Sequence, residues 1–574
     1  MGRFQIWLIK PTRYDDDGYP LQWWRSIIPS NSLACLAGVV NDAVARGVVG
    51  EAGADVYAID EIHDHVDPAR IIRDIARRGG RGFIAMVGVQ TNQYPRALDL
   101  ARQFRRAGLP VSIGGFHVSG SISMLKQMTP ELIEAQTLGI GLFAGESEDG
   151  RIDEVLRDAL HGQMKPLYNH LKVTPGLDGA PIPMMPRSQV AKNMSHYSSF
   201  DLGRGCPFEC SFCTIINVQG RKSRFRSADD LEEIIRANAA QGIDRFFVTD
   251  DNFARNRNWE AFCDRLIALR GEGLAVRLVL QVDTLAHQIP GFIDKCVAAG
   301  ADQIFIGLEN VNADSLEAAK KRQNRVEDYR AMFLAWKRHP VFITCGYIVG
   351  FPNDSYDSIM RDIEILKDEL AVDTIYLNYL TPLPGSEDHR RLHEAGVWID
   401  PDLTRYDLSH RVTHHGQMSD DDWERAYRDA HASFYSWEHM ERIIKRMIAL
   451  RSNKKFTTIN RLLAYREAVR LEGVAKLESG YVRIKRRGQR RPGLPREGMV
   501  SFHIGYWRHL ARSLGGSIVT YARLRLMLYR ALRDPARFDY RDRAITPVHS
   551  DELHLLSDTR STAHADRRRN QATA

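Results

Sequence analysis

The sequence predicts an α/β protein in three parts. These are an N-terminal flavodoxin-like, doubly wound sheet, a partial (β/α)6 TIM-like barrel, and a mainly helical C-terminal region. Two series of short apolar runs alternate with helical patterns, a Pro-rich stretch separates the series, and strand signals fade after about residue 400. Buried parallel strands appear as continuous apolar runs, and their crossover connections are usually helices.

The first series occupies residues 1–173. Its expected strands are Phe4–Ile9, Asp55–Ile59, Gly82–Val89, Pro110–Gly115 and Leu138–Ala144. Its expected helices lie near Asn31–Val44, Asp67–Arg77, Pro95–Arg106 and Ser121–Ala135. Ligands of a doubly wound sheet bind at the carboxyl ends of its strands. The loops after these strands are therefore the expected ligand-binding positions.

A linker is expected at residues 174–198, because Thr174–Arg187 contains four prolines and two glycines. That composition favours an extended connection. The second series follows at residues 199–400. Its expected strands are Ser199–Gly203, Arg245–Val248, Val276–Val282, Gln303–Leu308, Phe342–Val349 and Thr374–Leu380. Helical patterns separate them, for example Asp229–Ala240, Trp259–Leu269, Ile289–Ala299 and Ser355–Leu366. Six β/α units indicate an incomplete barrel, since a closed one has eight.

Composition and charge describe the rest of the chain. With 574 residues, 44% hydrophobic and 26% charged, the chain is globular, and seven cysteines exclude a disulfide scaffold. No run of about 18 apolar residues and no secretion signal occurs, so a cytoplasmic protein is expected.

Residues 401–556 should be helical and basic, interrupted by a polar loop at Arg483–Pro495, and residues 557–574 should be a disordered tail. Residues 441–550 carry 26 basic against 8 acidic side chains, whereas residues 1–440 carry 49 against 60. This contrast suggests that the basic part has its own partner.

Three cysteines are clustered directly after the first strand of the second series. They stand in the segment Gly203-Arg204-Gly205-Cys206-Pro207-Phe208-Glu209-Cys210-Ser211-Phe212-Cys213. Thiolates that converge from one loop suit an iron–sulfur cluster, which proteins hold through cysteines. Three ligands on a four-iron cluster leave one iron open to a substrate or cofactor. We therefore predict a 4Fe-4S cluster on Cys206, Cys210 and Cys213.

Two other interpretations of these thiols compete with the cluster. A structural zinc site needs four ligands, commonly in paired Cys-x-x-Cys elements. The remaining cysteines show no such pairing and are expected to be ordinary buried thiols; they are Cys35, Cys263, Cys296 and Cys345. Three unrelated buried cysteines are the second alternative, which the spacing at a strand–loop junction disfavours.

The cysteine segment resembles the Cys-x-x-x-Cys-x-aromatic-Cys signature of the radical S-adenosylmethionine (SAM) enzymes, with Phe212 as the aromatic residue. Three later elements at strand ends resemble further motifs of that family in the same order. They are Gly307-Leu308-Glu309-Asn310, Gly346-Tyr347-Ile348-Val349-Gly350-Phe351-Pro352 and Thr381-Pro382-Leu383-Pro384-Gly385-Ser386. The resemblance covers about residues 195–390.

The resemblance implies both a reaction and a set of SAM-binding residues. In this family the open iron binds SAM, and one electron, from a donor such as flavodoxin or ferredoxin, cleaves it into methionine and a 5′-deoxyadenosyl radical. Phe212 would then lie beside SAM, and Glu309 would hold its ribose or amino acid part. Backbone near Gly346, Ile348 and Gly350 would hold the adenine. The alternative for Glu309 is a surface carboxylate at a strand end.

Two further carboxylates end the second strand of this series, in Thr249-Asp250-Asp251-Asn252. Their position favours contact with a ligand, but a helix-capping or turn role is about as well supported. The resemblance assigns no catalytic side chain.

A flavodoxin-like domain before such a barrel resembles the cobalamin (B12)-binding subfamily of radical SAM enzymes. The matching elements are Gly114-Gly115-Phe116-His117 and Gly145-Glu146-Ser147-Glu148. They imply that cobalamin is bound by Gly114, Gly115, His117 and Gly145.

One departure from this subfamily concerns the cobalt ligand. The Asp-x-His-x-x-Gly motif is missing, since Lys10–Gln22 contains no histidine and His63 and His65 lack the following glycine. Many members of the subfamily also lack the motif. Two outcomes stay open, a cobalamin with no histidine on cobalt and a sheet that has lost the cofactor. His63, His65 and His117 are expected to be exposed or capping residues rather than metal ligands.

Several functions compete. The leading hypothesis is B12-dependent methyl transfer to an unactivated carbon of a small-molecule or lipid-like substrate. The alternatives are oxidative cyclisation of a porphyrin-like molecule, and a plain radical SAM enzyme that has lost cobalamin. Methylthiolation of transfer RNA would need a second cysteine triplet, but Cys35 stands alone. A non-enzymatic nucleic-acid scaffold would leave the whole SAM constellation unexplained.

Apolar stripes accompany the basic residues of the C-terminal region. One stripe comprises Trp437, Met440, Ile443, Ile444, Met447 and Ile448, and the other Leu524, Met527, Leu528 and Ala531. A basic amphipathic helix can lie on an anionic membrane, which would give peripheral membrane contact. The alternative is that both stripes pack on the barrel. Nucleic acid is not expected, because no aromatic stacking platform lies among the charges.

Overall fold

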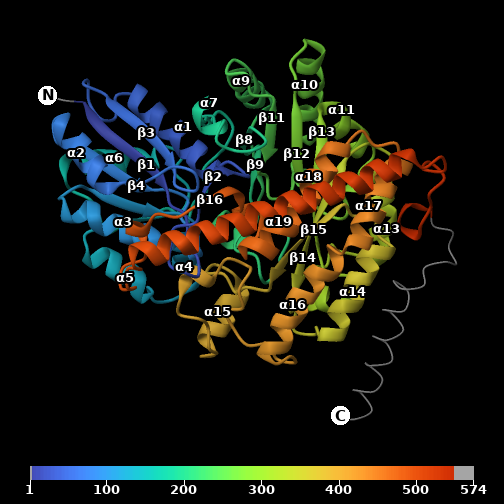
Figure 1. The fold of residues 1–574 in the computed structure, drawn as a ribbon. Helices are drawn as coiled ribbons and strands as arrows, with labels where there is room; N and C mark the ends of the chain where they lie inside the picture. Colours follow the sequence, from blue (N-terminus) through green and yellow to red (C-terminus); the bar gives the residue numbers. More distant parts are fainter. Residues whose placement is uncertain (1–2, 548–574) are drawn as a thin grey trace.

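The computed structural model describes residues 3–547 as a sheet domain, a barrel and a helical C-terminal region (Figure 1). The predicted tail 557–574 and the end of the predicted C-terminal region, 548–556, lie outside the described residues.

The N-terminal domain is a parallel six-stranded sheet in the order β3-β1-β4-β5-β6-β7. Its strands are β1 (Phe4–Lys10), β3 (Ala54–Asp60), β4 (Gly82–Met86), β5 (Val111–Gly114), β6 (Gly141–Ala144) and β7 (Leu167–Asn169). Its helices are α1 (Asn31–Ala45), α2 (Pro68–Arg77), α3 (Tyr94–Arg106), α4 (Phe116–Met124), α5 (Pro130–Thr137) and α6 (Arg151–His161). The predicted flavodoxin-like sheet is confirmed.

Two details of this domain differ from the sequence prediction. The structure adds β7 and α6, and it replaces the single helix expected at Ser121–Ala135 with α4 and α5. Pro130 begins α5 because proline fits the first turn of a helix, where its missing N–H has no intrahelical role.

The barrel is a second parallel sheet of six strands, in the order β15-β14-β13-β12-β11-β8. Its strands are β8 (Tyr197–Phe200), β11 (Arg245–Val248), β12 (Arg277–Val282), β13 (Ala301–Glu309), β14 (Phe342–Val349) and β15 (Thr374–Tyr379). Its main helices are α9 (Ala228–Ala239), α10 (Trp259–Gly271), α11 (Phe292–Ala299), α12 (Ala313–Ala318), α13 (Tyr329–Lys337) and α14 (Tyr356–Asp368). Among the described strands β8 and β15 remain edges, so the barrel is open on that side as predicted.

The predicted linker packs against the N-terminal domain instead of forming a free spacer. Met184 donates its backbone N–H to the Ala34 carbonyl of α1 at 3.3 Å. A side chain at Gly38 would meet the Ile182 carbonyl oxygen at 2.2 Å, so this close approach requires glycine. One short helix, α7 (Arg187–Val190), lies within the linker.

The C-terminal region contains α16 (Asp420–Phe434), α17 (Trp437–Ala449), α18 (Lys455–Glu472) and α19 (Met499–Arg533). Both apolar stripes of the sequence prediction face inward. Met440, Ile443, Ile444, Met447 and Ile448 of α17 are buried, as are Leu524, Leu528 and Ala531 of α19, while Trp437 and Met527 are partly buried. The membrane prediction was therefore wrong for these two stripes, and the packing alternative is confirmed.

A two-stranded sheet joins a segment near the N-terminus to a segment of the C-terminal region. β2 (Gln22–Ser26) pairs antiparallel with β16 (Gly480–Ile484), and the Trp23 indole N–H donates to the Glu478 carbonyl at 2.8 Å. The polar loop predicted from Arg483 therefore begins two residues too early, because Arg483 and Ile484 belong to β16. This pairing fixes the C-terminal region to the N-terminal domain.

Candidate functional site

The cysteine loop follows β8 and is held by two carboxylates from the loop after β11. Asp250 accepts a hydrogen bond from the Leu202 backbone N–H at 2.6 Å, and Asp251 accepts one from the Gly205 N–H at 3.0 Å. Burial raises the pKa of each aspartate to about 7. Of the two roles that the sequence leaves open, these contacts support the turn role.

The surroundings of the cysteine loop keep two of its thiols protonated. Burial raises the pKa of Cys206, and it raises that of Cys213 to about 12, so these thiols keep their protons unless a metal takes their place. Within residues 3–547 no group of three or more His, Cys, Asp or Glu side chains converges on a point where one ion could bind. A single zinc ion needs such convergence, whereas the three thiolates of a four-iron cluster each bind a different iron.

The remaining four cysteines lie apart from this loop. Cys35, Cys263, Cys296 and Cys345 are all buried, as the sequence predicts. The Cys35 thiol donates to Asp201 at 3.0 Å, and the sulfurs of Cys263 and Cys296 are 3.9 Å apart. Cys263, Cys296 and Cys345 are core thiols, whereas Cys35 also lines a cavity of the N-terminal domain.

A cavity of about 1350 Å³ occupies the barrel interior. Four of the five residues predicted to bind SAM line it, namely Phe212, Glu309, Gly346 and Ile348. They come from the cysteine loop and from the carboxyl-terminal halves of β13 and β14. The structure thus brings the family motifs together at one end of the barrel.

Gly350 is the predicted SAM residue that does not line this cavity. Its φ is +103°, and a side chain there would meet the Trp423 ring of α16 at 2.3 Å. Its backbone N–H donates to Asp354 at 3.0 Å. Gly350 therefore shapes the turn after β14 and lets Trp423 pack against it.

Glu309 ends β13 in a strained conformation. Its φ is +65°, which is rare for a residue other than glycine, and the register with β14 shifts between Gly307 and Glu309. Such strain is typical of binding sites. Glu309 accepts a hydrogen bond from Lys321, whose nitrogen also lies 5.7 Å from the centre of the Phe212 ring.

Lys321 is a site residue that sequence analysis missed. Burial alone would lower the pKa of Lys321, but the neighbouring carboxylate of Glu309 raises it above its usual value. In the sequence it stands in the polar run Lys320–Asn324, which has the composition of an ordinary surface loop. Only folding shows that Lys321 turns inward while Lys320 pairs with exposed Glu387.

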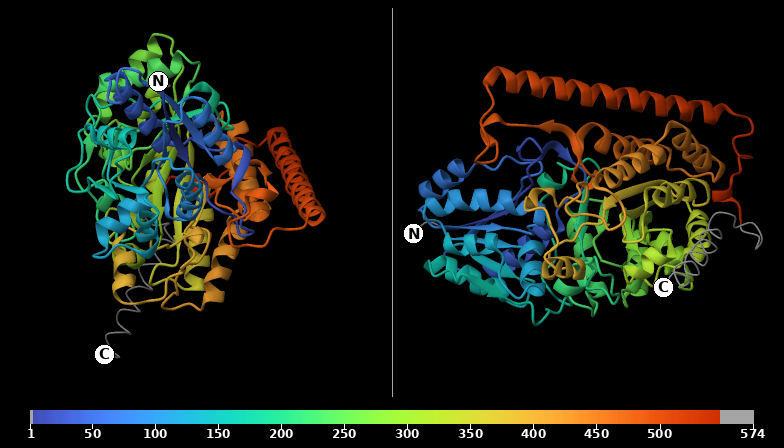
Figure 2. Two further views of the ribbon diagram at one scale, coloured as in Figure 1. Left: turned by 90° about the vertical axis from the view of Figure 1, so that its left-hand side faces the viewer. Right: turned by 90° about the horizontal axis from the view of Figure 1, so that it is seen from below.

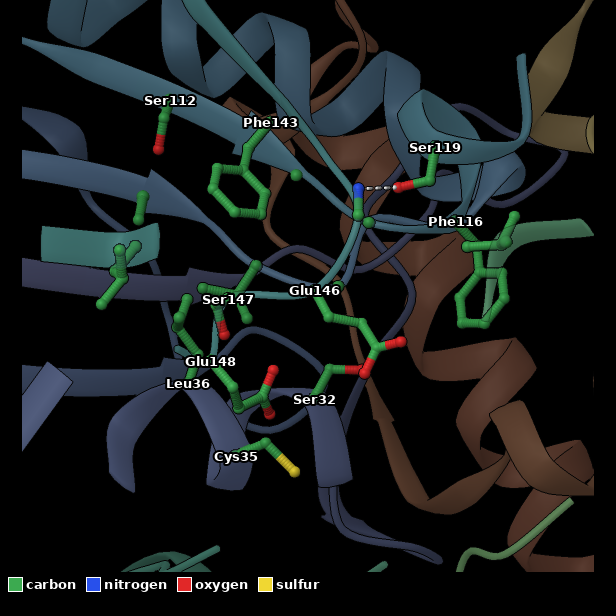
Figure 3. Close-up of a pocket in the computed structure, with 18 of the residues that line it drawn as sticks. Ser32, Cys35, Leu36, Ser112, Phe116, Ser119, Phe143, Glu146, Ser147 and Glu148 are labelled. Atoms are coloured by element: carbon green, nitrogen blue, oxygen red, sulfur yellow. Dashed lines mark hydrogen bonds between the residues drawn. The ribbon is translucent and has the colours of Figure 1, made fainter. Parts of the chain in front are cut away.

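A second cavity, of about 960 Å³, lies in the N-terminal domain beside the carboxyl ends of β4, β5 and β6 (Figure 3). Gly114, Gly115 and Gly145 line it, as the cobalamin prediction requires. Small polar side chains surround much of the space: Ser32, Ser112, Ser119 and Ser147. Ser119 also accepts a hydrogen bond from the Gly145 backbone N–H at 3.0 Å.

His117 is not part of this cavity, which departs from the prediction. It is buried, with Nδ1 3.3 Å from the Thr91 hydroxyl and Nε2 3.2 Å from Glu131. The other two histidines singled out by the sequence also lie elsewhere, and His63 contacts Gln189 at 2.9 Å. No histidine lines the barrel cavity or the N-terminal cavity in the described chain.

The acidic residues of the Gly145–Glu148 element join the two domains. Arg204, two residues before Cys206, reaches Glu146 and Glu148 at 2.7 Å each and Asp201 at 3.1 Å. All four side chains are almost completely buried. The cysteine loop is therefore fixed directly to the wall of the N-terminal cavity.

A third cavity, of about 1250 Å³, lies between the two domains. It begins at the carboxyl ends of β1 and β3, where Lys10 and Asp60 line it. Its other wall consists of side chains that also line the barrel cavity: Ile28, Tyr376, Leu383, Leu408 and Leu477. The ligand edge of the N-terminal sheet therefore faces the barrel interior across a shared wall.

Comparison with known proteins agrees with this geometry. Residues 201–366 match the family model of the radical SAM superfamily. This region is therefore a radical SAM domain.

Relatives resemble more than the barrel. Bacteriochlorophyllide d C-8(2)-methyltransferase from Chlorobaculum tepidum is 24% identical, over 62% of this chain and 79% of its own length. Hopanoid C-2 methylase from Rhodopseudomonas palustris is 24% identical, over 58% of this chain and 61% of its own length. The solved structure of the radical enzyme OxsB, with aqua-cobalamin and SAM bound, has a TM-score of 0.54 at 13% identity and covers 98% of this chain and 84% of its own. The fold of almost the whole chain is thus shared with a solved structure.

Proposed function

We propose that this chain is a cobalamin-dependent radical SAM methyltransferase that methylates an unactivated carbon of an apolar small molecule or lipid. The observation that carries the proposal is the wall shared by the interdomain and barrel cavities. A cofactor bound at the carboxyl edge of the first sheet would face a substrate held in the barrel.

The radical chemistry would depend on residues at the carboxyl end of the barrel. Cys206, Cys210 and Cys213 would hold a 4Fe-4S cluster, and Glu309, Gly346 and Ile348 would hold SAM. Cluster and SAM together supply a radical able to remove hydrogen from carbon, and cobalamin supplies a methyl carrier. The protein would orient these groups and exclude water, and Tyr376 and Leu383 of the shared wall would contribute apolar surface to that exclusion.

The N-terminal cavity fits cobalamin in chemistry as well as in place. Two of its buried acceptor atoms, Asn31 Oδ1 and Glu148 Oε2, have no hydrogen-bond partner within the described residues. Cobalamin carries amide side chains and a ribose hydroxyl, which are donors for such acceptors. Because no described histidine lines this cavity or the interdomain cavity, we propose that cobalt has no histidine ligand.

The named relatives support an apolar substrate. Bacteriochlorophyllides and hopanoids, the substrates in their names, are both polycyclic. The barrel cavity has matching walls, formed largely by Phe247, Val279, Ile304, Phe305 and Tyr376. Apolar surface is also what such a cavity would bury most favourably.

One charged group in the cavity narrows the substrate class further. Arg461 of α18 lines the end of the cavity remote from Glu309 and donates to the Gln303 side chain at 2.8 Å. Within residues 3–547 no carboxylate lies within 4.0 Å of its guanidinium group. Arg461 is half-buried and would pair favourably with an anion, so we propose that the substrate carries a carboxylate or similar anion at one end.

Spectroscopy of the reconstituted protein tests the cofactor part of the proposal. Anaerobically reconstituted protein should contain one four-iron cluster and one cobalamin. The paramagnetic resonance of its Co(II) form should lack nitrogen splitting from an axial ligand. Iron without cobalamin would favour the plain radical SAM alternative, and imidazole splitting lost in His63→Ala or His65→Ala would refute the ligand claim. Mass analysis of products from candidate substrates would distinguish methylation, a gain of one CH₂, from oxidative cyclisation.

The substrate class can be tested before the substrate is known. Polycyclic carboxylic acids and their methyl esters form matched pairs of probes in a thermal-shift assay. Acids should stabilise the wild-type protein more than their esters do, and Arg461→Gln should remove the difference. Arg425→Gln, which breaks an exposed pair with Asp422 on α16, is the control. Equal stabilisation by acid and ester would contradict the role of Arg461.

A further inference from the structure

The longest helix of the protein has a second apolar face that the fold leaves uncovered. α19 spans 35 residues and lies along the outer edge of the molecule in both views of Figure 2. No helix within residues 3–547 is long and apolar enough to cross a membrane. We propose that the outward face of α19 docks the enzyme on an anionic membrane surface.

The inner face of α19 is held in place by specific contacts. Thr520 donates to Glu467 of α18 at 2.9 Å, and His509 lies 2.9 Å from Glu472. A side chain at Gly516 would meet Leu471 at 2.9 Å, so the two helices approach closely there. The orientation of α19 is therefore fixed, and its other side must face away from the protein.

The outward face carries a continuous apolar row. Val500, Trp507 and Ile518 are 72%, 62% and 68% exposed. The row consists of Val500, Ile504, Trp507, Ala511, Leu514, Ile518, Ala522, Leu526 and Tyr529, at steps of three or four residues. Single exposed apolar residues are normal, but a contiguous row marks an interaction surface. At 1.5 Å per residue, this one is about 44 Å long.

The charges of α19 indicate the partner. Residues 499–533 contain six arginines and no Asp or Glu. Within the described chain, no carboxylate lies within 4.0 Å of any of these arginines. Arg508, Arg512 and Arg530 are exposed near the apolar row. A basic helix with an apolar face is the pattern of peripheral membrane proteins.

The same charges argue against a second copy of this chain as the occupant. Two α19 helices that packed along their apolar rows would place arginines beside arginines. Neither helix offers an acidic residue to relieve the repulsion. Anionic lipid headgroups complement the arginines, and the acyl chains beneath them accept the apolar row.

α19 lies on the side of the molecule where α18 of the C-terminal region lines the barrel cavity. α19 packs against α18, which contributes Arg461 and Tyr465 to that cavity. The inference does not depend on the proposed methyl transfer, since membrane docking requires neither cofactor nor substrate.

Vesicle sedimentation of the full chain tests the proposal. The wild-type protein should sediment with vesicles of phosphatidylglycerol and phosphatidylcholine, and salt should weaken this binding. Trp507→Ser with Ile518→Ser should lower it at least tenfold. Each basic residue strengthens such binding about fivefold, so replacing Arg508, Arg512 and Arg530 by Gln should lower it about 100-fold.

Controls keep the test specific. Ile267→Ser removes an exposed apolar residue from α10, a different helix, and should leave binding unchanged. Circular dichroism should show that every variant is folded. Absence of binding to anionic vesicles, or equal binding to neutral ones, would overturn the proposal. So would a dimer in sedimentation velocity that Trp507→Ser dissociates, because α19 would then bind a second copy.

Discussion

The Lys321 ammonium nitrogen lies 2.8 Å from Oε1 of Glu309, at the end of the barrel cavity where Phe212 also lies. The pair connects the strained end of β13 to the loop that follows α12. It also places a positive charge beside the cysteine loop, where thiolate ligands of a cluster would gather negative charge.

Glu309→Gln should keep the iron–sulfur cluster and weaken SAM binding about ten- to a hundredfold, because it removes a charged hydrogen-bond partner. Lys321→Gln should weaken SAM binding too, since Lys321 orients Glu309. Lys320→Gln is a matched control, because Lys320 forms an ion pair with Glu387 and does not contact Glu309 within residues 3–547. Equilibrium binding of SAM to the reconstituted proteins measures all three. An unchanged dissociation constant in Glu309→Gln would return Glu309 to a structural role.

Replacing Cys206, Cys210 and Cys213 together by Ala should abolish both iron binding and SAM cleavage. The reason is that iron–sulfur clusters depend on thiolate ligands. Iron analysis and detection of 5′-deoxyadenosine provide the measurements. Replacement of the buried pair Cys263 and Cys296 by Ala should leave the iron content unchanged. A full cluster in the triple variant would rule out this assignment.

Arg204→Met should destabilise the protein by about 3–5 kcal/mol, because it leaves buried Glu148 without its counter-charge, whereas Glu146 and Asp201 keep Arg224 and Arg226. Arg221→Met breaks an exposed pair with Glu209 and should cost less than about 1 kcal/mol. Denaturant unfolding of the two variants measures the difference. Equal costs would show that the Arg204 network does not hold the domains together.

Stability should fall as the pH rises from about 6.5 to 9, through His410. Burial alone would lower its pKa, but Asp16 and Asp407 raise the pKa of His410 from 6.5 to about 9. Because the pKa of His410 is higher in the folded state than in the unfolded state, protonated His410 stabilises the folded state fully below pH 6.5. This contribution to the free energy of unfolding is lost as the pH rises through 9. It amounts to about 3 kcal/mol. Unfolding curves of wild type and His410→Gln should converge towards high pH; a constant difference would contradict this linkage.

The sequence predicts those parts of the fold that short-range patterns determine. The apolar runs of β11 and β14 match the observed strands at both ends, because a barrel strand packs against helices on one face and turns the other to the barrel interior, which favours mainly apolar residues. The pairing of β2 with β16 could not be predicted. Each strand is only five residues long, and more than 450 residues separate the two strands in the sequence.

Site residues could be predicted from the sequence where they belong to a short, contiguous motif. The cysteine loop and the ends of β13 and β14 carry recognisable spacings, and the structure brings Phe212, Glu309 and Ile348 into one cavity. Lys321 and Arg461 carry no local signal, because a lysine or arginine on an ordinary helix or loop is usually solvated. Their function depends on which way the backbone turns them.

Pairing of β2 with β16 also has a consequence for synthesis on the ribosome. Trp23 and Glu478, which are hydrogen-bonded across this junction, stand 455 residues apart. At 5–20 residues per second, the N-terminal strand must wait about 20–90 s for its partner to be made. Meanwhile the edge of β2 and the Trp23 side chain stay uncovered on the nascent chain. Chaperones that bind unpaired strands should therefore associate with this protein during translation and leave once Gly480–Ile484 emerges.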